Sequence, residues 1–260
     1  MMSLTNNRTF FFSCLLLINF NAWSSDRLRE RQYAKEILQN LNSGTTIYLG
    51  EQQFLALYNE TESAENRGTA ILLHDAGQHP DSKPIIHKLR VRLPDHQWAT
   101  LSLQLPVYEY GAKTDEYFEL FSEAFKRIQA AVDYLQKNDV KNIALIGYGM
   151  GGLMAVSYVF ESKNTAIREI VAISLSTPET ENKFSNTLKF LQKINLPILD
   201  IYGSADIASV SKNARKKRIA AKHNPQYRQV MINETRRPYQ NYQELLVKRI
   251  YSWLIQASDN

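Results

Sequence analysis

The sequence predicts an α/β protein: a three-layer sandwich around a mostly parallel sheet of eight strands. From residue 70 onward, short apolar runs alternate with helical patterns, which is typical of parallel strands joined by right-handed crossovers. Before them, residues 45–49 and 53–58 have the β-branched and aromatic content of two paired strands. The 260 residues, 44% of them hydrophobic, are enough for a full core. No repeat or long linker divides residues 25–260, so we expect a single domain.

The elements follow in order along the chain. A helix is expected over 27–41, because its apolar residues recur at helical spacing and Asn42-Ser43-Gly44 ends it. The clearest amphipathic helix is expected over 116–136, where nine apolar residues form one wide stripe. Six parallel strands are predicted at 70–73, 98–103, 143–146, 170–175, 198–202 and 227–232. The remaining helices are predicted at 84–93, 150–160, 183–194, 206–223 and 239–255.

The N-terminus has the pattern of a secretory signal peptide over residues 1–24. An apolar run of about a dozen residues ends before Ala22-Trp23-Ser24, which resembles a small-x-small cleavage site, and the run is too short to span a bilayer comfortably. We expect an exported, periplasmic protein with no transmembrane segment after cleavage; the alternative is an uncleaved anchor. The single cysteine, Cys14, lies in this segment. The mature chain would therefore have no disulfide, thiolate nucleophile or cysteine metal site.

The charge is mildly positive, +5 for the whole chain, but the cations are uneven. Six of them lie between Lys212 and Lys222. Such a run can attract phosphates or anionic lipid headgroups, although a solvated helix face is the simpler interpretation. Nucleic acid is not expected as a partner of an exported protein. The oligomeric state is left open.

A glycine-rich turn joins the strand at 143–146 to the next helix and reads Gly147-Tyr-Gly149-Met-Gly151. This setting resembles the nucleophile elbow Gly-x-Ser-x-Gly, in which glycines permit a sharp turn and close helix–strand approach. The chain thus resembles an α/β-hydrolase without a large lid insertion. More narrowly, segments 72–81, 98–106, 147–151 and 199–206 resemble a proteobacterial family of exported α/β-hydrolase-like proteins of uncharacterised role.

The resemblance implies a catalytic triad that is degenerate here. Gly149 stands at the nucleophile position and has no side chain to attack a carbonyl. Asp206 stands where the acid is commonly found, although it could instead cap the following helix. No histidine follows His223, and Arg236 or Arg237 occupies the place of the general base. Arginine stays protonated and cannot accept a serine proton, so two of three members are absent.

The oxyanion-hole segment is recognisable as His74-Asp75-Ala76-Gly77. Backbone N–H groups of Ala76 and Met150 could converge there on an anion or a carbonyl oxygen. The ligand-binding candidates are His74, Asp75, Ala76, Gly77, Tyr148, Gly149 and Met150. The residues His74, Asp75, His79 and Asp81 form no standard metal signature, so no metal and no cofactor are expected.

Three hypotheses follow. The first is a pseudoenzyme that binds a small ligand or an envelope partner. The second is an esterase-like hydrolase with displaced machinery, using Ser174, Ser176 or Thr177 with His74 or His79 as base. The third is an envelope interaction protein with a vestigial pocket and the 212–218 basic face as its contact.

Overall fold

The computed structural model describes residues 25–162 and 164–258, and it confirms the predicted fold class. One eight-stranded sheet has the order β1-β2-β4-β3-β5-β6-β7-β8. Only the pairings of β2 with β1 and β4 are antiparallel. The strands are β1 Thr45–Leu49, β2 Phe54–Asn59, β3 Gly68–Leu73, β4 Trp98–Leu103, β5 Ile143–Tyr148, β6 Ile167–Ile173, β7 Ile198–Gly203 and β8 Tyr227–Ile232.

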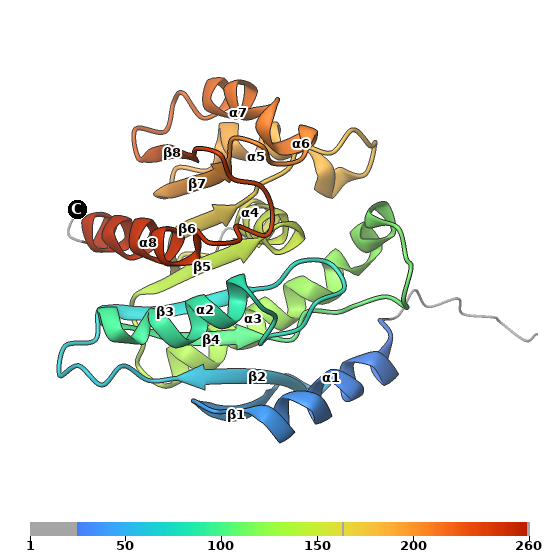
Figure 1. Cartoon of the computed structure of the whole chain (residues 1–260), viewed down its shortest axis with the longest axis vertical. Coiled ribbons are helices and arrows are strands. Elements are labelled where there is room, and N and C mark those ends of the chain that lie inside the picture. The colour runs from blue at the N-terminus through green and yellow to red at the C-terminus, as the bar shows by residue number, and fades with distance from the viewer. Residues whose placement is uncertain (1–24, 163, 259–260) are drawn as a thin grey trace, which may run out of the picture.

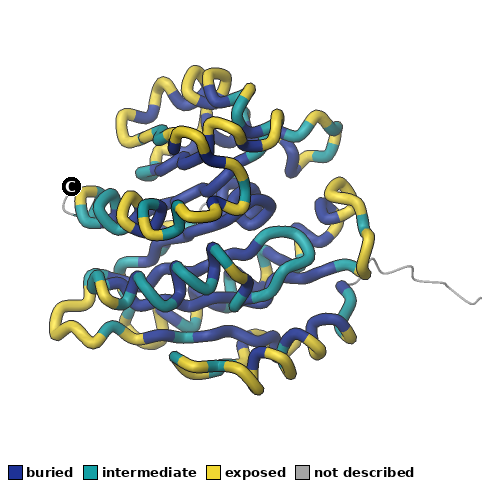
Figure 2. The backbone as a smooth tube through the Cα atoms, in the orientation of Figure 1, coloured by how far each residue is buried: buried dark blue, intermediate teal, exposed yellow. Residues whose placement is uncertain are grey.

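Helices cover both faces of this sheet (Figure 1). One face packs against α2 and α8, and the other against α3, α4 and α5. Central strands such as β3, β5 and β7 are buried along their whole length, whereas the outer sides of the helices are exposed (Figure 2). The helices are α1 Arg27–Asn40, α2 Ile85–Arg92, α3 Phe121–Lys137, α4 Met150–Ser162, α5 Thr187–Lys193, α6 Ala208–Ser211, α7 Ala214–Ala220 and α8 Gln243–Ser258, with 3₁₀ turns at Pro94–His96, Thr114–Leu120 and Lys183–Ser185.

Several predicted boundaries are wrong, for local reasons. The helix expected over 206–223 is two short helices, α6 and α7, with a break at Asn213. The last helix begins at Gln243 instead of 239, because Tyr239 and Asn241 both have positive φ. The strand expected to reach 175 ends at Ile173, because Ser174 has a φ of 55°. The predicted helices over 116–136 and 183–194 each begin with a 3₁₀ turn.

The predicted signal peptide, with Cys14, lies outside the described residues. Within the part that is described, no helix is long and apolar enough to cross a membrane. Export and cleavage after Ser24 therefore stay predictions.

Candidate active site

The turn from β5 into α4 is built by close backbone approach. Gly149, between the strand and the helix, has a φ of 57°, in the left-handed region that disfavours side chains. Gly151 lies so near β3 that a Cβ there would be 2.3 Å from the Leu73 carbonyl oxygen. This geometry presents residue 149 at the carboxyl edge of the sheet, where open α/β folds place their sites.

The space that a side chain at position 149 would need is already filled. A Cβ on Gly149 would lie 2.1 Å from Arg237 Nη2 and 2.3 Å from Asp75 Oδ1, distances that real Cβ atoms essentially never show. Position 149 thus lacks both a hydroxyl and the space for one, because the side chains of Arg237 and Asp75 occupy that volume.

Asp75 also occupies the oxyanion hole. Its Oδ1 accepts hydrogen bonds from Ala76 N, at 2.9 Å, and from Met150 N, at 2.7 Å. The sequence predicts that these two N–H groups bind an outside anion or carbonyl oxygen. Oxyanion-hole donors act at about 2.7–3.1 Å, so an internal carboxylate oxygen stands where a substrate oxyanion would be held. In this structure the two N–H groups are already paired within the chain.

Arg237 lies in the turn after β8 and is the second charged side chain at the elbow. Its guanidinium donates to Asp75 Oδ2, and it lies over the Tyr148 ring at 5.0 Å from the ring centroid. Burial opposes its charge, but Asp75 and Tyr148 outweigh that effect and raise the pKa of Arg237. Each member of the Arg237–Asp75 pair keeps 21% of its side chain exposed, so the pair lies at the surface.

The turn that carries Arg237 is fixed against the loop after β7. Ala205 N donates to Thr235 O at 2.9 Å, and Glu234 N donates to Ser204 Oγ at 2.9 Å. Gly203 permits this contact, because a Cβ there would lie 2.2 Å from Thr235 O. Arg236 is exposed, so Arg237 is the one of the two candidates that enters the site.

Asp206 is buried beside this turn, but its partners are not those of a triad acid. Its Oδ2 accepts a hydrogen bond from Ser174 Oγ at 2.5 Å, and Tyr239 lies 2.9 Å from the same hydroxyl. The expected capping role is wrong: Ile207 is the N-cap of α6, and Asp206 Oδ1 accepts only the Ile207 N–H. Burial raises the pKa of Tyr239, so its hydroxyl stays protonated. No sequence pattern had singled out this tyrosine.

The contacts of His74 and His79 do not support the hypothesis that one of them acts as a displaced general base. His74 is 2% exposed, accepts a hydrogen bond from Leu105 N at Nε2 and donates from Nδ1 to Asp75 O. Burial lowers its pKa to about 3. His79 packs on the Tyr33 ring at a centroid distance of 5.0 Å, and its Nδ1 accepts from Asp81 N. Neither ring is hydrogen-bonded to a serine hydroxyl.

The oxyanion loop is anchored by α1, a contact that the sequence did not reveal. Tyr33 Oη donates to Gly77 O at 2.7 Å, and Arg29 Nη2 donates to the same oxygen at 2.8 Å. Arg29 also stacks on the ring of Tyr110 at 4.0 Å. The segment just after the predicted signal peptide therefore holds the loop that carries Asp75.

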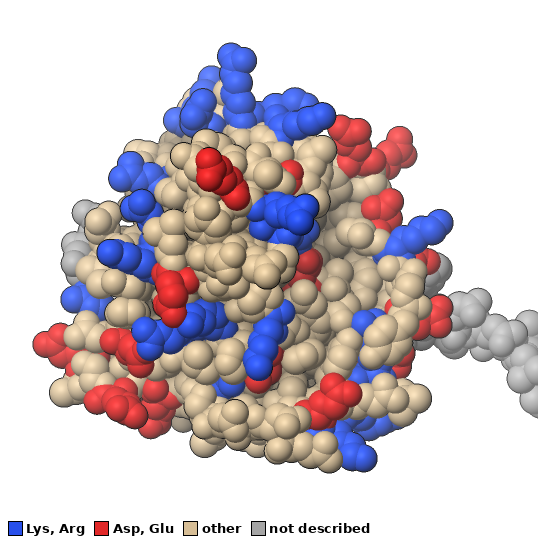
Figure 3. Space-filling model, viewed as in Figure 1, with Lys and Arg blue, Asp and Glu red and all other residues tan. Residues whose placement is uncertain are grey.

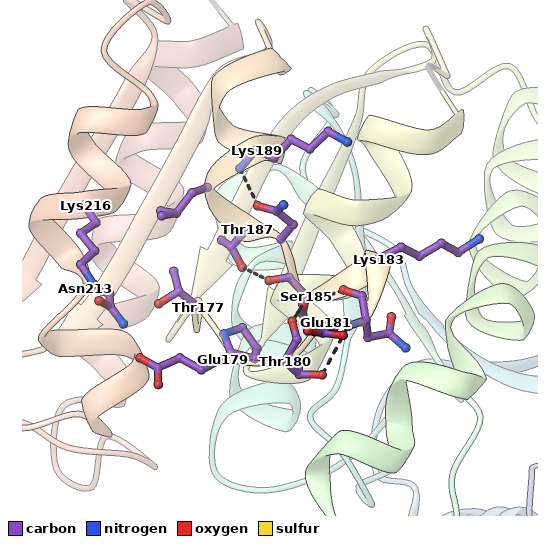
Figure 4. A pocket seen from close by; sticks show the side chains of 14 residues that line it. Thr177, Glu179, Thr180, Glu181, Lys183, Ser185, Thr187, Lys189, Asn213 and Lys216 are labelled. Carbon is purple, nitrogen blue, oxygen red and sulfur yellow. Dashed lines mark hydrogen bonds between the residues drawn. The ribbon is translucent and has the colours of Figure 1, made fainter.

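A separate cavity of about 410 Å³ lies beyond the end of β6, between the following loop and α5 and α7 (Figure 4). Most of the residues that line it are polar, but their hydroxyls are engaged with the backbone. Thr187 Oγ1 donates to Ser176 O at 2.7 Å, and Ser185 Oγ donates to Thr180 O at 2.8 Å. Ser176 and Thr177 lie on this side, and Thr177 Oγ1 donates to Ser209 O. No histidine lines the cavity.

The described residues include no group of three His, Cys, Asp or Glu side chains that could hold a metal ion. The loop residues weighed for that role pair locally instead. Asp81 Oδ1 contacts His87 Nδ1 at 2.9 Å and the Arg90 guanidinium at 2.8 Å.

Comparisons with known proteins agree with this fold. Est1E from Butyrivibrio proteoclasticus superposes with a TM-score of 0.66 at 17% identity, covering 84% of this chain and 100% of that one. The Pyrococcus furiosus esterase Pf2001 gives 0.64 at 18% identity, with 85% and 94% covered. TT1662 from Thermus thermophilus gives 0.66 at 14% identity, with 84% and 99% covered. At such identities the likeness shows the α/β-hydrolase fold alone. A comparison with curated proteins gave no match.

A family match covers nearly all of the chain. Residues 24–116 and 112–256 match the family described as "Protein of unknown function (DUF3530)". The chain therefore belongs to the DUF3530 family, with an α/β-hydrolase fold whose elbow holds Gly149 under an internal Asp75–Arg237 pair.

Proposed function

We propose that this protein is an exported, non-catalytic member of the α/β-hydrolase fold that acts by binding. The observation that carries the proposal is the double occupation of the site. Arg237 fills the nucleophile's volume, and Asp75 satisfies the two N–H groups of the oxyanion hole. Electrostatic stabilisation in that hole is usually the largest single contribution to acyl transfer, so its loss adds to the loss of nucleophile and base.

Displaced machinery is the weaker alternative. Ser174 is fully buried and donates to Asp206. Its other partner is the hydroxyl of Tyr239, where a catalytic serine would have a histidine. An unactivated serine hydroxyl is a weak nucleophile, and a carbonyl substrate cannot reach a hydroxyl with no exposed surface. The structure therefore favours the non-catalytic hypothesis over this one.

The occupied hole also changes where binding is to be sought. The ligand set of the first hypothesis would have to displace Asp75 from both N–H groups and from Arg237 before it could bind. A contact on the outer surface, the third hypothesis, needs no such displacement. We place the binding function on the surface for this reason.

The test is a broad esterase and amidase screen with fluorophosphonate labelling of the purified protein. An active esterase of the same fold serves as the positive control. We expect neither turnover nor labelling, in the wild type and in Gly149→Ser alike. Stoichiometric labelling at Ser174 or Ser176, or saturable ester hydrolysis by Gly149→Ser, would overturn the non-catalytic proposal.

A further inference from the structure

A long segment at one end of the sheet contains no acidic residue. Between Asp206 and Glu234 there is neither Asp nor Glu, while seven Lys and Arg residues occur. This segment comprises α6, α7 and the edge strand β8. Gln229 Nε2 donates to Ala214 O at 2.9 Å, so β8 and α7 lie side by side. We call this surface the α7 face.

The cations of the α7 face are exposed and unpaired, with one exception. Lys217 is fully buried and pairs with Asp200 at 2.9 Å, which fixes α7 to the sheet. Five other cations are exposed, and none of them forms an ion pair with a described residue: Lys212, Arg215, Lys216, Arg218 and Lys222. Arg228 is exposed as well, but it lies beside Trp253 and Gln256 of α8 and is not part of the α7 face. Figure 3 shows Lys and Arg gathered over α7 at the top of the molecule.

The same segment carries three exposed large apolar side chains. Ile219, on α7, is 54% exposed, Met231 on β8 is 51% exposed, and Ile207, just before α6, is 48% exposed. Residues three and four apart share one side of a helix, so Arg215, Arg218 and Ile219 project together. The α7 face thus combines unpaired positive charge with aliphatic surface.

We propose that the α7 face docks on an anionic lipid surface. Lipid phosphates supply the negative charge that the exposed cations lack, and the acyl region directly beneath them accepts Ile219, Met231 and Ile207. Peripheral binding of this kind grows with buried apolar area and with attraction to anionic headgroups.

Other anionic partners fit these observations less well. Nucleic acid would match the cations, but it gives exposed isoleucine and methionine no apolar region to enter. Two acids border the surface: Glu179 shares a cavity with Lys212 and Lys216, and both Glu179 and Glu181 line the cavity of about 410 Å³ together with Lys216. The side around Arg215, Arg218 and Ile219 is therefore the part that we expect to meet the bilayer.

The experiment is vesicle co-flotation of the chain beginning at Ser25, whose residues hold the whole sheet and both cores. Vesicles are made of phosphatidylcholine alone or of an equal mixture with phosphatidylglycerol. The variant Arg215→Gln, Arg218→Gln, Lys222→Gln is compared with a matched control, Lys35→Gln, Lys126→Gln, Lys137→Gln, which removes three exposed cations elsewhere. Thermal unfolding of each variant checks that it is folded.

We expect binding only to the anionic vesicles. The α7 variant should bind roughly a hundredfold more weakly, since each cation near an anionic surface contributes about 1 kcal/mol, and the control should bind like the wild type. Ile219→Ser should also weaken binding, and salt near 1 M, where the Debye length is about 3 Å, should reverse it. Equal binding to both vesicle types, equal loss in the two triple variants, or binding to duplex DNA without binding to vesicles would overturn the proposal.

Discussion

Replacing Gly149 with alanine measures how firmly the internal pair fills the elbow. The positive φ alone costs about 1–2 kcal/mol for a residue with a Cβ. The new Cβ would also overlap Arg237 Nη2 and Asp75 Oδ1, so the ion pair and the two N–H bonds of Asp75 must shift. Because the Arg237–Asp75 ion pair is partly exposed, its contribution to stability is limited to about 1 kcal/mol. The charge-assisted hydrogen bonds that Asp75 accepts from the two N–H groups add about 1.5–3 kcal/mol. Together these three contributions give an expected loss of about 3.5–6 kcal/mol.

The chain offers a matched control for the backbone contribution. Gly111 also has a positive φ, 88°, but a Cβ there would meet no atom within 4 Å. Gly111→Ala should therefore cost only about 1–2 kcal/mol. Urea unfolding of both variants, with midpoints and slopes compared, gives the difference directly.

A double-mutant cycle then assigns that difference to the pair. In an Arg237→Ala background, Gly149→Ala should cost at least about 1 kcal/mol less than in the wild type, because one of its two obstructing groups is gone. If Gly149→Ala costs no more than Gly111→Ala, or if its cost is the same in both backgrounds, the elbow is not filled as described.

Three further predictions concern other parts of the molecule. Burial raises the pKa of Glu169 from 4.5 to about 7, so between these pH values the folded state holds a proton that the unfolded state has released. The free energy of unfolding should therefore fall by about 3 kcal/mol as the pH rises from 4.5 through 7. Urea denaturation at pH 5 and pH 8 should show this fall in the free energy of unfolding for the wild type and a smaller fall for Glu169→Gln. Equal falls in the two proteins would contradict the role of Glu169. Lys217→Met should lower the free energy of unfolding by about 3–5 kcal/mol, because it leaves buried Asp200 without its counter-ion, and Asp200→Asn in the same chain should recover part of the loss. A loss below 1 kcal/mol would mean that the ion pair is not needed. Mass spectrometry of the protein from the cell envelope should give an N-terminus at Ser25 or close to it, whereas an intact Met1 would support the uncleaved anchor.

The fold was predictable because it depends on short-range patterns. Runs such as 143–146 and 198–202 are apolar throughout, as strands buried on both faces require, and their alternation with helices determines the topology. The boundaries of helices and strands were less predictable where single residues take unusual conformations. Ser174 and Tyr239 have positive φ, which neither serine nor tyrosine predicts from its residue type.

The sequence named Gly149, Asp75 and Arg237 as site residues, but it did not predict how they are connected. Gly149 and Arg237 follow from their places after particular strands, because the hydrolase order of elements assigns a role to each turn. The pairing of Asp75 with Arg237 depends on side chains 162 residues apart, and the entry of Asp75 into the oxyanion hole depends on one rotamer. The anchoring of Gly77 by Arg29 and Tyr33 is equally long-range.

The mutual dependence of Gly149, Asp75 and Arg237 also limits how this chain could change over generations. A serine at 149 would collide with the guanidinium, a histidine at 237 would face no nucleophile and leave Asp75 uncompensated, and the removal of Asp75 alone would leave Arg237 without its partner. Each single step is unfavourable or without benefit, because the advantage appears only when all are made together. Under the proposed non-catalytic function, single substitutions at this elbow therefore do not lead to turnover, whereas positions remote from these three residues can change without disturbing them.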